Sequence, residues 1–351
     1  MSDINEIWEM PVPWLSGQGI HSDVALAGRM RLARNLENYP FPHHASEDKL
    51  EEIVTRIQDV ITSQTVLPEA TFIPLQRLSL SERQMLLERR LISPEFAQRS
   101  SHGAVVLDRQ CRISLMVNEE DHIRLQALDA GMNLDLLWEQ VHRVDMDLGK
   151  VLDYAFSEEF GSLTSCPTNT GTGLRISILM YLPALALDEG NLEAIFHQAN
   201  PAGLTVRGFY GEGSDVVGNI YQISNKLTLG WTEFRLLEDL LKIASQIVDK
   251  EQDARRKLME NRHIDVEDKI FRSLGLLERA RKLSSREFIE QYANLMLGIL
   301  IGLITEIEPQ ALHELILWVQ PAHLQWQYGK DLSPVERDVY RAEMVRTKLG
   351  L

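Results

Sequence analysis

The chain has 351 residues, of which 44% are hydrophobic and 25% are charged, and its formal net charge is -15 at pH 7. This composition allows two or three hydrophobic cores and excludes a largely disordered chain. The strong negative charge argues against nonspecific binding to nucleic acid, because the phosphates would be repelled.

The start of the chain, "MSDINEIWEM", is acidic where an export signal carries basic residues, so we expect a cytoplasmic protein. The longest apolar run, residues 294–304, is too short to span a bilayer and contains two glycines, which favours a buried helix. The two cysteines, Cys111 and Cys166, are too few for a disulfide framework and lack the paired spacing of a zinc site. Reduced thiols are therefore expected.

Strand and helix patterns alternate over residues 1–250. Residues 103–118 contain two β-rich runs around a polar centre, which predicts an antiparallel hairpin. Residues 203–210 and 218–224 predict a second hairpin around a glycine-rich stretch. Residues 134–156 and the residues after Gly173 space apolar side chains at three and four, which indicates helices. The first domain is therefore predicted to be α+β.

Strand patterns end near residue 250, where we place a domain boundary. In residues 251–351 Ser284 and Glu287 have the spacing of a capping box, which starts a helix. Pro309, Pro321 and Pro334 then separate short helices. The second domain is predicted to be all-α.

The glycine-rich stretch "SCPTNTGTGLR", residues 165–175, lacks the lysine that follows the last glycine of a P-loop. Three interpretations stay open at this point. The stretch could bind phosphate through Arg175, supply a nucleophile through Cys166, or only turn the chain.

Arginines recur beside loops in this acidic chain, at Arg29, Arg31, Arg124 and Arg207. Guanidinium groups make forked contacts to phosphate oxygens, so these residues would form an anion site if they converged. Taken alone, each of them is better explained as a solvated or ion-paired surface residue, so the anion site depends on their convergence.

Acidic residues follow an apolar strand in "NEEDHIR", residues 118–124, and Glu212 is a further carboxylate in a glycine-rich loop. Such acids can be a solvated strand end, metal ligands, a general base or contacts for a cationic substrate. His122 has no partner at the spacing of zinc peptidases, which argues against a catalytic metal site.

Four motifs, "RMRLARNL", "NEEDHIR", "TSCPTNTGTGLR" and "RGFYGEG...ISNK", occur in the order found in phosphagen (guanidino) kinases, and the chain resembles that family from about residue 29 to 226. It is most similar to the bacterial protein arginine kinases of the McsB type. Their helical domain is C-terminal, and "RDVYRA", residues 337–342, matches their RDxxRA motif. The resemblance implies an antiparallel β-sheet flanked by helices, followed by an all-α domain for phosphoarginine binding and dimerisation.

The resemblance also implies roles for individual residues. Glu120 and Glu212 would orient the substrate guanidinium and accept its proton, and Cys166 would lie beside it. Magnesium would be held by the phosphates of ATP and by water, without a protein metal site. Arg90 stands where a histidine is common in the family. The implied nucleotide contacts are Arg29, Met30, Arg31, Arg90, Arg124, Arg175 and Arg207, and the implied phosphoarginine contacts are Arg337, Asp338 and Arg341.

The implied function is ATP-dependent phosphorylation of arginine side chains in proteins, which marks them for an AAA+ protease in a stress response. Implied partners are protein substrates, an activator protein, the protease unfoldase and further copies of the chain in a homodimer or larger assembly, with allosteric control. No direct nucleic acid or membrane partner is expected. A kinase of free arginine and an inactive phosphoarginine-binding adaptor are the alternatives; the combination of both glutamates, five arginines and the cysteine argues against the adaptor.

Overall fold

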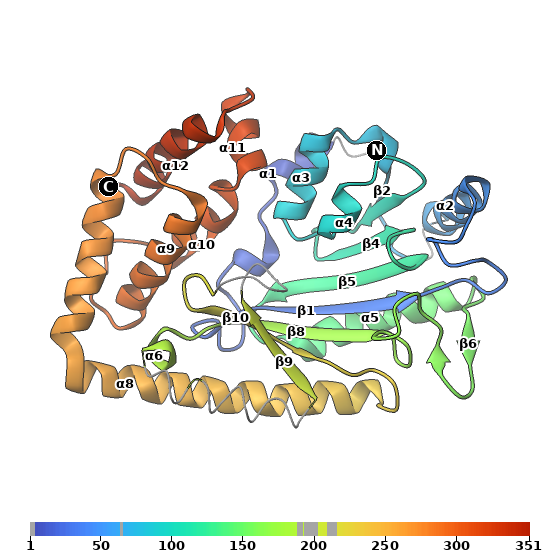
Figure 1. Ribbon diagram of the computed structural model, residues 1–351, viewed down its shortest axis with the longest axis horizontal. Helices are drawn as coiled ribbons and strands as arrows, with labels where there is room; N and C mark the ends of the chain where they lie inside the picture. The colour runs from blue at the N-terminus through green and yellow to red at the C-terminus, as the bar shows by residue number, and fades with distance from the viewer. Residues whose placement is uncertain (1–3, 64–65, 188–191, 193–202, 209–215) are drawn as a thin grey trace.

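The structure is a computed structural model that describes residues 4–63, 66–187, 192, 203–208 and 216–351. An antiparallel sheet dominates the first part of the chain, with strand order β2-β3-β4-β5-β1-β8-β10-β9 among the described residues (Figure 1). The strands are β1 (Ala25–Arg34), β2 (Thr71–Pro74), β3 (Ala104–Leu107), β4 (Ile113–Val117), β5 (Ile123–Ala130), β8 (Leu174–Tyr181), β9 (Leu204–Gly208) and β10 (Ile220–Asn225). A separate small hairpin joins β6 (Phe156–Ser157) to β7 (Gly161–Ser162).

Both predicted hairpins are confirmed, because β3 pairs with β4 and β9 pairs with β10. The helix predicted after Gly173 is wrong, since Leu174–Tyr181 is the strand β8. Its apolar residues alternate along the strand, with Ile176 and Ile178 fully buried. In a run this short, apolar residues spaced two apart also satisfy a helical spacing of four, so the pattern does not separate the two structures.

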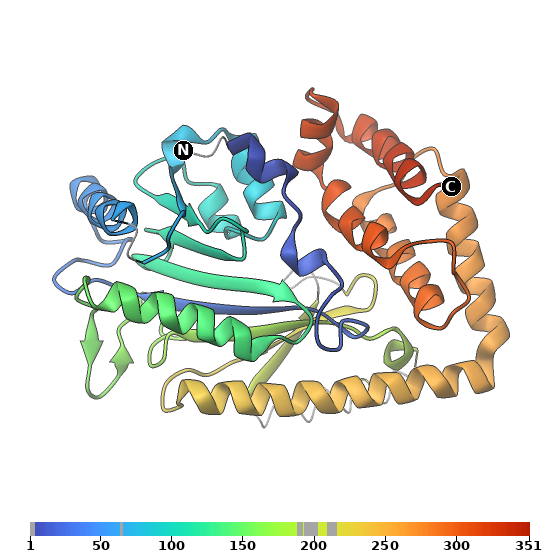
Figure 2. The ribbon, with the colours of Figure 1, turned by 180° about the vertical axis from the view of Figure 1, so that it is seen from behind.

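The central sheet has one apolar face and one face that is polar at its centre. The apolar face is buried by α2 (Glu47–Thr62), α5 (Leu134–Gly149) and the first half of α8 (Glu233–Arg279), and Figure 2 shows α5 lying across it. Alternation along β1 sends Met30 and Leu32 into this core and Arg29 and Arg31 to the other face. The two-residue period of the strands thus collects charged side chains on one side.

The helix α8 continues past the sheet into the C-terminal helices, and residue 250, the predicted boundary, lies inside it. The helix bends at Arg262, whose φ of -139° and ψ of 30° are not helical. The remaining helices are α9 (Ser285–Leu300), α10 (Pro309–Trp318), α11 (Pro321–Tyr328) and α12 (Pro334–Leu349). Ser284 caps α9 and a proline begins each of the last three, so the predicted starts are confirmed. In the described part of the chain, no helix is both long and apolar enough for a membrane span.

Short helices in the first hundred residues pack beside the sheet and against the C-terminal helices: α1 (Ile4–Glu9), η1 (Pro13–Leu15), η2 (Leu75–Arg77), α3 (Leu80–Glu88) and α4 (Pro94–Ala97). A further short helix, α6 (Pro183–Ala186), follows β8 and packs against α8 and α9. The buried carboxylate of Glu88, at the end of α3, accepts hydrogen bonds from the backbone N–H groups of Ala322 (2.9 Å) and His323 (3.1 Å) at the start of α11. The Nδ1 atom of His323 lies 2.7 Å from the same carboxylate. A side chain from the part of the chain that surrounds the sheet therefore holds the start of α11.

We expect Glu88→Ala to lower the free energy of unfolding by about 3 to 5 kcal/mol, because three buried donors lose their acceptor. Denaturant unfolding of the full chain measures this change. The matched control is Glu260→Ala, an exposed residue of α8, which should change stability by less than about 0.5 kcal/mol. Equal stability of the two variants would contradict the role given to Glu88.

Candidate active site

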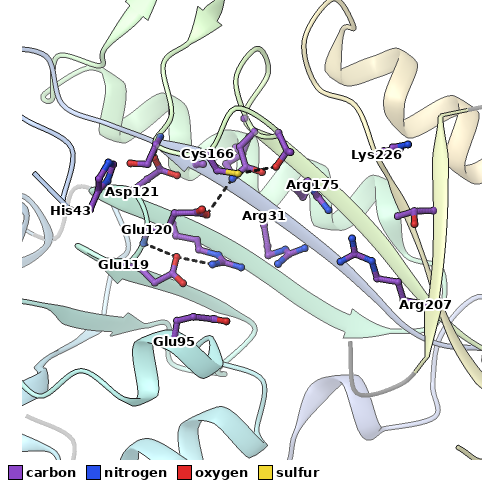
Figure 3. Close-up of a pocket in the computed structure, with 18 of the residues that line it drawn as sticks. Arg31, His43, Glu95, Glu119, Glu120, Asp121, Cys166, Arg175, Arg207 and Lys226 are labelled. Atoms are coloured by element: carbon purple, nitrogen blue, oxygen red, sulfur yellow. Dashed lines mark hydrogen bonds and ion pairs between the residues drawn. The ribbon is translucent and has the colours of Figure 1, made fainter. Parts of the chain in front are cut away.

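A pocket of about 810 Å³ opens on the polar side of the sheet, and it joins side chains from distant parts of the chain (Figure 3). One part of its lining is basic and another carries carboxylates and a thiol. Both Cys166 and Arg175 of the glycine-rich loop line this pocket. A phosphate contact by Arg175 and a reactive thiol at Cys166 are therefore compatible with one site. The charged or nucleophilic side chains in the lining are Arg31, His43, Glu95, Arg99, Glu119, Glu120, Asp121, Arg124, Cys166, Arg175, Arg207 and Lys226.

The register of three central strands brings the arginines together. Arg31 of β1 lies directly opposite Arg175 of β8, and on its other side it lies opposite Gln126 of β5. Arg124 is two residues from Gln126, so it projects from the same face of β5. Arg29 is two residues from Arg31 and donates a hydrogen bond to Gln222 Oε1 of β10 (3.3 Å). Like charges placed opposite one another destabilise a sheet, so the cluster needs a compensating anion.

The electrostatics of the cluster support the same conclusion. Burial, followed by the charges of Arg90, Arg124 and Arg175, lowers the pKa of Arg29 to about 9. Burial and neighbouring guanidinium groups lower the pKa of Arg31 as well. The Nε atom of Arg31 is buried and has no hydrogen-bond partner among the described residues. A polyphosphate supplies both the negative charge and the acceptor oxygens that this region lacks.

Three predicted nucleotide contacts, Arg29, Met30 and Arg90, do not line the pocket. Arg29 still belongs to the arginine cluster, two residues from Arg31 on β1. The side chain of Met30 is fully buried in the core on the opposite face of β1, which removes it from the candidate contacts of the pocket. Arg90 does not line the pocket, and its guanidinium lies 5.2 Å from the centre of the Trp14 ring. The charge of Arg90 still lowers the pKa of Arg29, so Arg90 adds positive charge near the cluster without lining the pocket.

Glu119 is the buried acid that holds one of the arginines. Its carboxylate accepts from Arg124 Nη1 (2.6 Å) and from the hydroxyl of Ser93 (2.6 Å). Burial raises the pKa of Glu119, but Arg124, Ser93 and the N–H of Glu120 outweigh burial and lower it. The carboxylate therefore stays ionised and fixes the direction of Arg124.

Glu120 is more exposed and faces the pocket near Cys166 (Figure 3). Partial burial, together with the charges of Asp121 and Glu119, raises its pKa above the ordinary range of a glutamate. The side-chain amide of Asn169 approaches its Oε2 at 3.5 Å. A carboxylate with a raised pKa, open to the pocket, is suited to accept a proton from a bound group.

The loop that carries Cys166 is fixed from several sides. Asp121 Oδ1 accepts from the backbone N–H of Ser165 (2.7 Å), and Cys166 Sγ lies 3.0 Å from Thr168 Oγ1. Gly173 has a φ of 68°, and a Cβ atom there would lie 2.6 Å from the carbonyl oxygen of Ala33. The loop therefore also makes a turn that requires glycine.

Several pocket residues were not assigned site roles by sequence reasoning. Glu119 and Asp121 flank Glu120 in the "NEEDHIR" motif, in which a role was predicted for Glu120 alone. Asn169 lies in the glycine-rich loop and Lys226 ends the "ISNK" motif, so membership of these motifs could have identified both residues as site candidates. Arg207 reaches the pocket as expected, and Glu212 lies outside the described residues.

The three residues of the "RDVYRA" motif lie on α12, in the C-terminal region and away from the pocket (Figure 1). Arg337 is partly exposed, whereas Arg341 is only 2% exposed. Arg341 donates to the carbonyl oxygens of Val319 (2.8 Å) and Leu283 (2.7 Å) and to Asp338 Oδ1 (2.6 Å). Arg341 therefore anchors α12 to its neighbours in this structure.

Within the described ranges, no group of three or more His, Cys, Asp or Glu side chains is arranged to hold a metal ion. The acids of the pocket are instead engaged with Arg124, Ser93 and the Cys166 loop. Of these acids, Glu119 and Asp121 thus position Arg124 and the loop of Cys166, whereas Glu120 remains open to a positively charged organic group.

Comparison with known proteins agrees with this geometry. Residues 52–254 match the family described as "ATP:guanido phosphotransferase, C-terminal catalytic domain", and residues 263–351 match "Protein-arginine kinase McsB C-terminal domain". Proteins named protein-arginine kinase are 43% identical over 338 residues in Halothermothrix orenii (96% of each chain) and 41% identical over 338 residues in Brevibacillus brevis (96% of this chain and 94% of that protein).

Solved structures share the fold at lower identity. A lombricine kinase matches with a TM-score of 0.58 and 21% identity, covering 71% of this chain and 75% of that chain. The duplicated taurocyamine kinase of Schistosoma mansoni matches with a TM-score of 0.59 and 23% identity, covering 80% of this chain and 41% of that chain. The predicted α+β fold, with an antiparallel sheet flanked by helices and a helical C-terminal region, is confirmed.

Proposed function

The chain belongs to the protein-arginine kinases of the ATP:guanido phosphotransferase family, and from this premise we propose that it transfers phosphate from ATP to arginine side chains of proteins. One observation carries the proposal: the pocket has two parts. One part is a cluster of arginines that needs an anion to balance its charge, and the other contains the carboxylate of Glu120 and the thiol of Cys166. Two oppositely charged groups, a polyphosphate and a guanidinium, fit these two parts.

The phosphate half works through preorganised positive charge. A phosphoryl group in transfer spreads negative charge over its oxygens, so its transition state is stabilised mainly by positioned cations. Arg31, Arg124, Arg175 and Arg207 would hold these oxygens, with Arg29 behind them. Glu119 would keep Arg124 aligned before the substrate arrives. Mg²⁺ would enter with ATP, bound to its phosphates and to water, and would neutralise part of their charge.

The guanidinium half must deprotonate a very weak acid. The side chain of arginine has a pKa above about 12 and is a poor nucleophile while protonated. Glu120 would orient the substrate guanidinium and take its proton, and Glu212 would contact its other edge. Cys166 would lie beside the guanidinium and position it without forming a covalent bond.

One experiment tests the function. The protein is incubated with ATP and Mg²⁺ and with either free arginine or an unfolded protein, and acid-labile phosphate is measured on each. Phosphate on the protein alone supports the proposal. Phosphate on free arginine would indicate a metabolite kinase, and no transfer to either would indicate a binding adaptor.

We also propose the wider role that the resemblance implies. Residues 1–250 would be the catalytic domain, and residues 251–351 would be a helical domain that binds phosphoarginine and dimerises. The match to the phosphotransferase family ends at residue 254 and the match to the C-terminal domain family begins at residue 263, which supports this division. The enzyme would act in the cytoplasm in a stress response, with an activator protein, and would mark proteins for an AAA+ protease. Phosphoarginine bound by Arg337, Asp338 and Arg341 would control it allosterically.

The buried position of Arg341 separates two effects within this motif. We expect Arg341→Ala to destabilise the protein by about 2 to 6 kcal/mol, because the carbonyl groups of Leu283 and Val319 lose their hydrogen-bond donor. Arg337→Ala should change stability by less than about 0.5 kcal/mol but weaken the binding of phosphoarginine. Denaturant unfolding and calorimetric titration measure the two effects, with the exposed Arg256→Ala as the control. If Arg341→Ala were as stable as Arg256→Ala, the anchoring role would be wrong.

A further inference from the structure

The small hairpin of β6 and β7 carries two exposed aromatic rings beside two exposed acids. The side chains of Phe156 and Phe160 are 67% and 45% exposed. Glu158 and Glu159 form the tip between them and are also exposed. Figure 1 shows the hairpin projecting beyond the edge of the sheet and its flanking helices. Exposed apolar side chains grouped with polar ones are typical of an interaction surface.

The hairpin is ordered, although its phenylalanines add little to the fold. The hydroxyl of Ser157 accepts hydrogen bonds from the N–H groups of Glu159 (3.3 Å) and Phe160 (3.4 Å), which fixes the turn. Each strand has only two residues, and such a short hairpin gains little stability by itself. Rings that stay this exposed bury little apolar area, so their contribution to folding is small. Their position favours contact with another molecule.

The hairpin is joined directly to the glycine-rich loop that carries Cys166. The N–H of Leu163 donates to the carbonyl oxygen of Ala155 (3.0 Å), and Ser162 forms a β-bridge with Gly171. The chain then reaches Cys166 of the pocket. Cys166 is six positions after Phe160, and six extended residues span at most about 20 Å. A polypeptide whose arginine lies in the pocket can therefore reach the hairpin with residues about six positions away.

We propose that this hairpin is a docking surface for the extended polypeptide that flanks the target arginine. This inference rests on the proposed function and deepens it by naming the kind of substrate segment that is bound. The two phenylalanines contact apolar side chains of the substrate, and Glu158 and Glu159 attract its basic residues. The segment must be unfolded over about six residues to reach both places, so folded proteins are poor substrates.

Charge favours this occupant over a second copy of the chain. Each copy carries a formal charge of -15, so two copies repel one another at an acidic surface. An arginine-bearing segment is attracted to the same surface. The acidic tip and the apolar rings together select a basic and apolar polypeptide.

The test compares two peptides that contain one central arginine. The long peptide has 25 residues, no stable structure, and apolar and basic residues about six positions from the arginine; the short peptide has five residues. For the double variant Phe156→Ala and Phe160→Ala we expect the KM of the long peptide to rise about tenfold, with kcat unchanged and with unchanged kinetics for the short peptide. The matched control is Phe271→Ala on α8, an exposed phenylalanine that should change neither KM.

The outcomes separate this inference from the proposed function. If the wild-type protein phosphorylates both peptides and the double variant is indistinguishable from it, the docking surface is wrong and the function stands. An equal loss of kcat/KM for both peptides would assign the rings a structural role and overturn docking. Docking would also be overturned if light scattering showed that the double variant has a different oligomeric state while its KM for the long peptide is unchanged. If the wild-type protein phosphorylates neither peptide, both proposals fail.

Discussion

Replacing Glu120 with glutamine should lower the turnover number on a protein substrate by about 10²- to 10⁴-fold and leave ATP affinity nearly unchanged. Glutamine keeps the shape of the side chain and its contact with Asn169, but it cannot take a proton from the guanidinium. Glu120 lies outside the arginine cluster that we propose for the phosphates, so binding of the nucleotide should persist. The loss should therefore appear in kcat rather than in the affinity for ATP.

The pH dependence gives a second measurement of the same role. Partial burial and the charges of Asp121 and Glu119 raise the pKa of Glu120. A base must be ionised to act, so the rate is present above this raised pKa and is lost as the pH falls through it. The acid limb of the wild-type pH–rate profile should therefore lie above the ordinary glutamate pKa of about 4.3, and Glu120→Gln should lack that limb.

The matched control for this prediction is Glu95→Gln, which neutralises an exposed acid on the lining of the same pocket. Its turnover should stay within about threefold of the wild-type value, because a single exposed surface charge contributes little. Wild-type turnover by Glu120→Gln on a protein substrate would show that another group accepts the proton.

Part of the predicted residue set lines one pocket, because its motifs lie on strands and on the loops that join them: Arg31, Glu120, Arg124, Cys166, Arg175 and Arg207. Alternation on β1 and β8 places Arg31 and Arg175 on one face, where the register sets them opposite each other. The same alternation turns the side chain of Met30 into the core on the other face. A motif specifies a stretch of chain, whereas the pleat of the strand decides which of its side chains reach the site.

Other features depend on packing between distant segments and could not be predicted from one chain. The burial of Arg341 depends on the carbonyl groups of Leu283 and Val319, which lie 58 and 22 residues away. The link between Glu88 and His323 spans 235 residues. The strand β8 was predicted as a helix because short apolar runs fit both periods, and only its pairing with β1 and β10 decides between them.

The two cysteines should differ sharply in reactivity, and modification of Cys166 should abolish activity. Cys166 is partly exposed in the pocket. Cys111 is buried, and burial raises the pKa of its thiol to about 11, despite the nearby charge of Arg89. At pH 8 a thiol with that pKa is ionised in roughly one molecule in a thousand, and the thiolate is the reactive form. An alkylating reagent should therefore label Cys166 first, which mass spectrometry of the peptides detects.

Activity should fall in step with the labelling of Cys166, because the added group occupies the space that the substrate guanidinium needs. Cys166→Ala should retain a reduced but measurable rate, since Cys166 is proposed to position the guanidinium without bonding to it. That variant is also the control for the reagent: treatment should not lower its remaining rate. Complete loss of activity in Cys166→Ala would instead make the thiolate essential, and the glycine-rich loop would then supply a catalytic group as well as Arg175 and a turn.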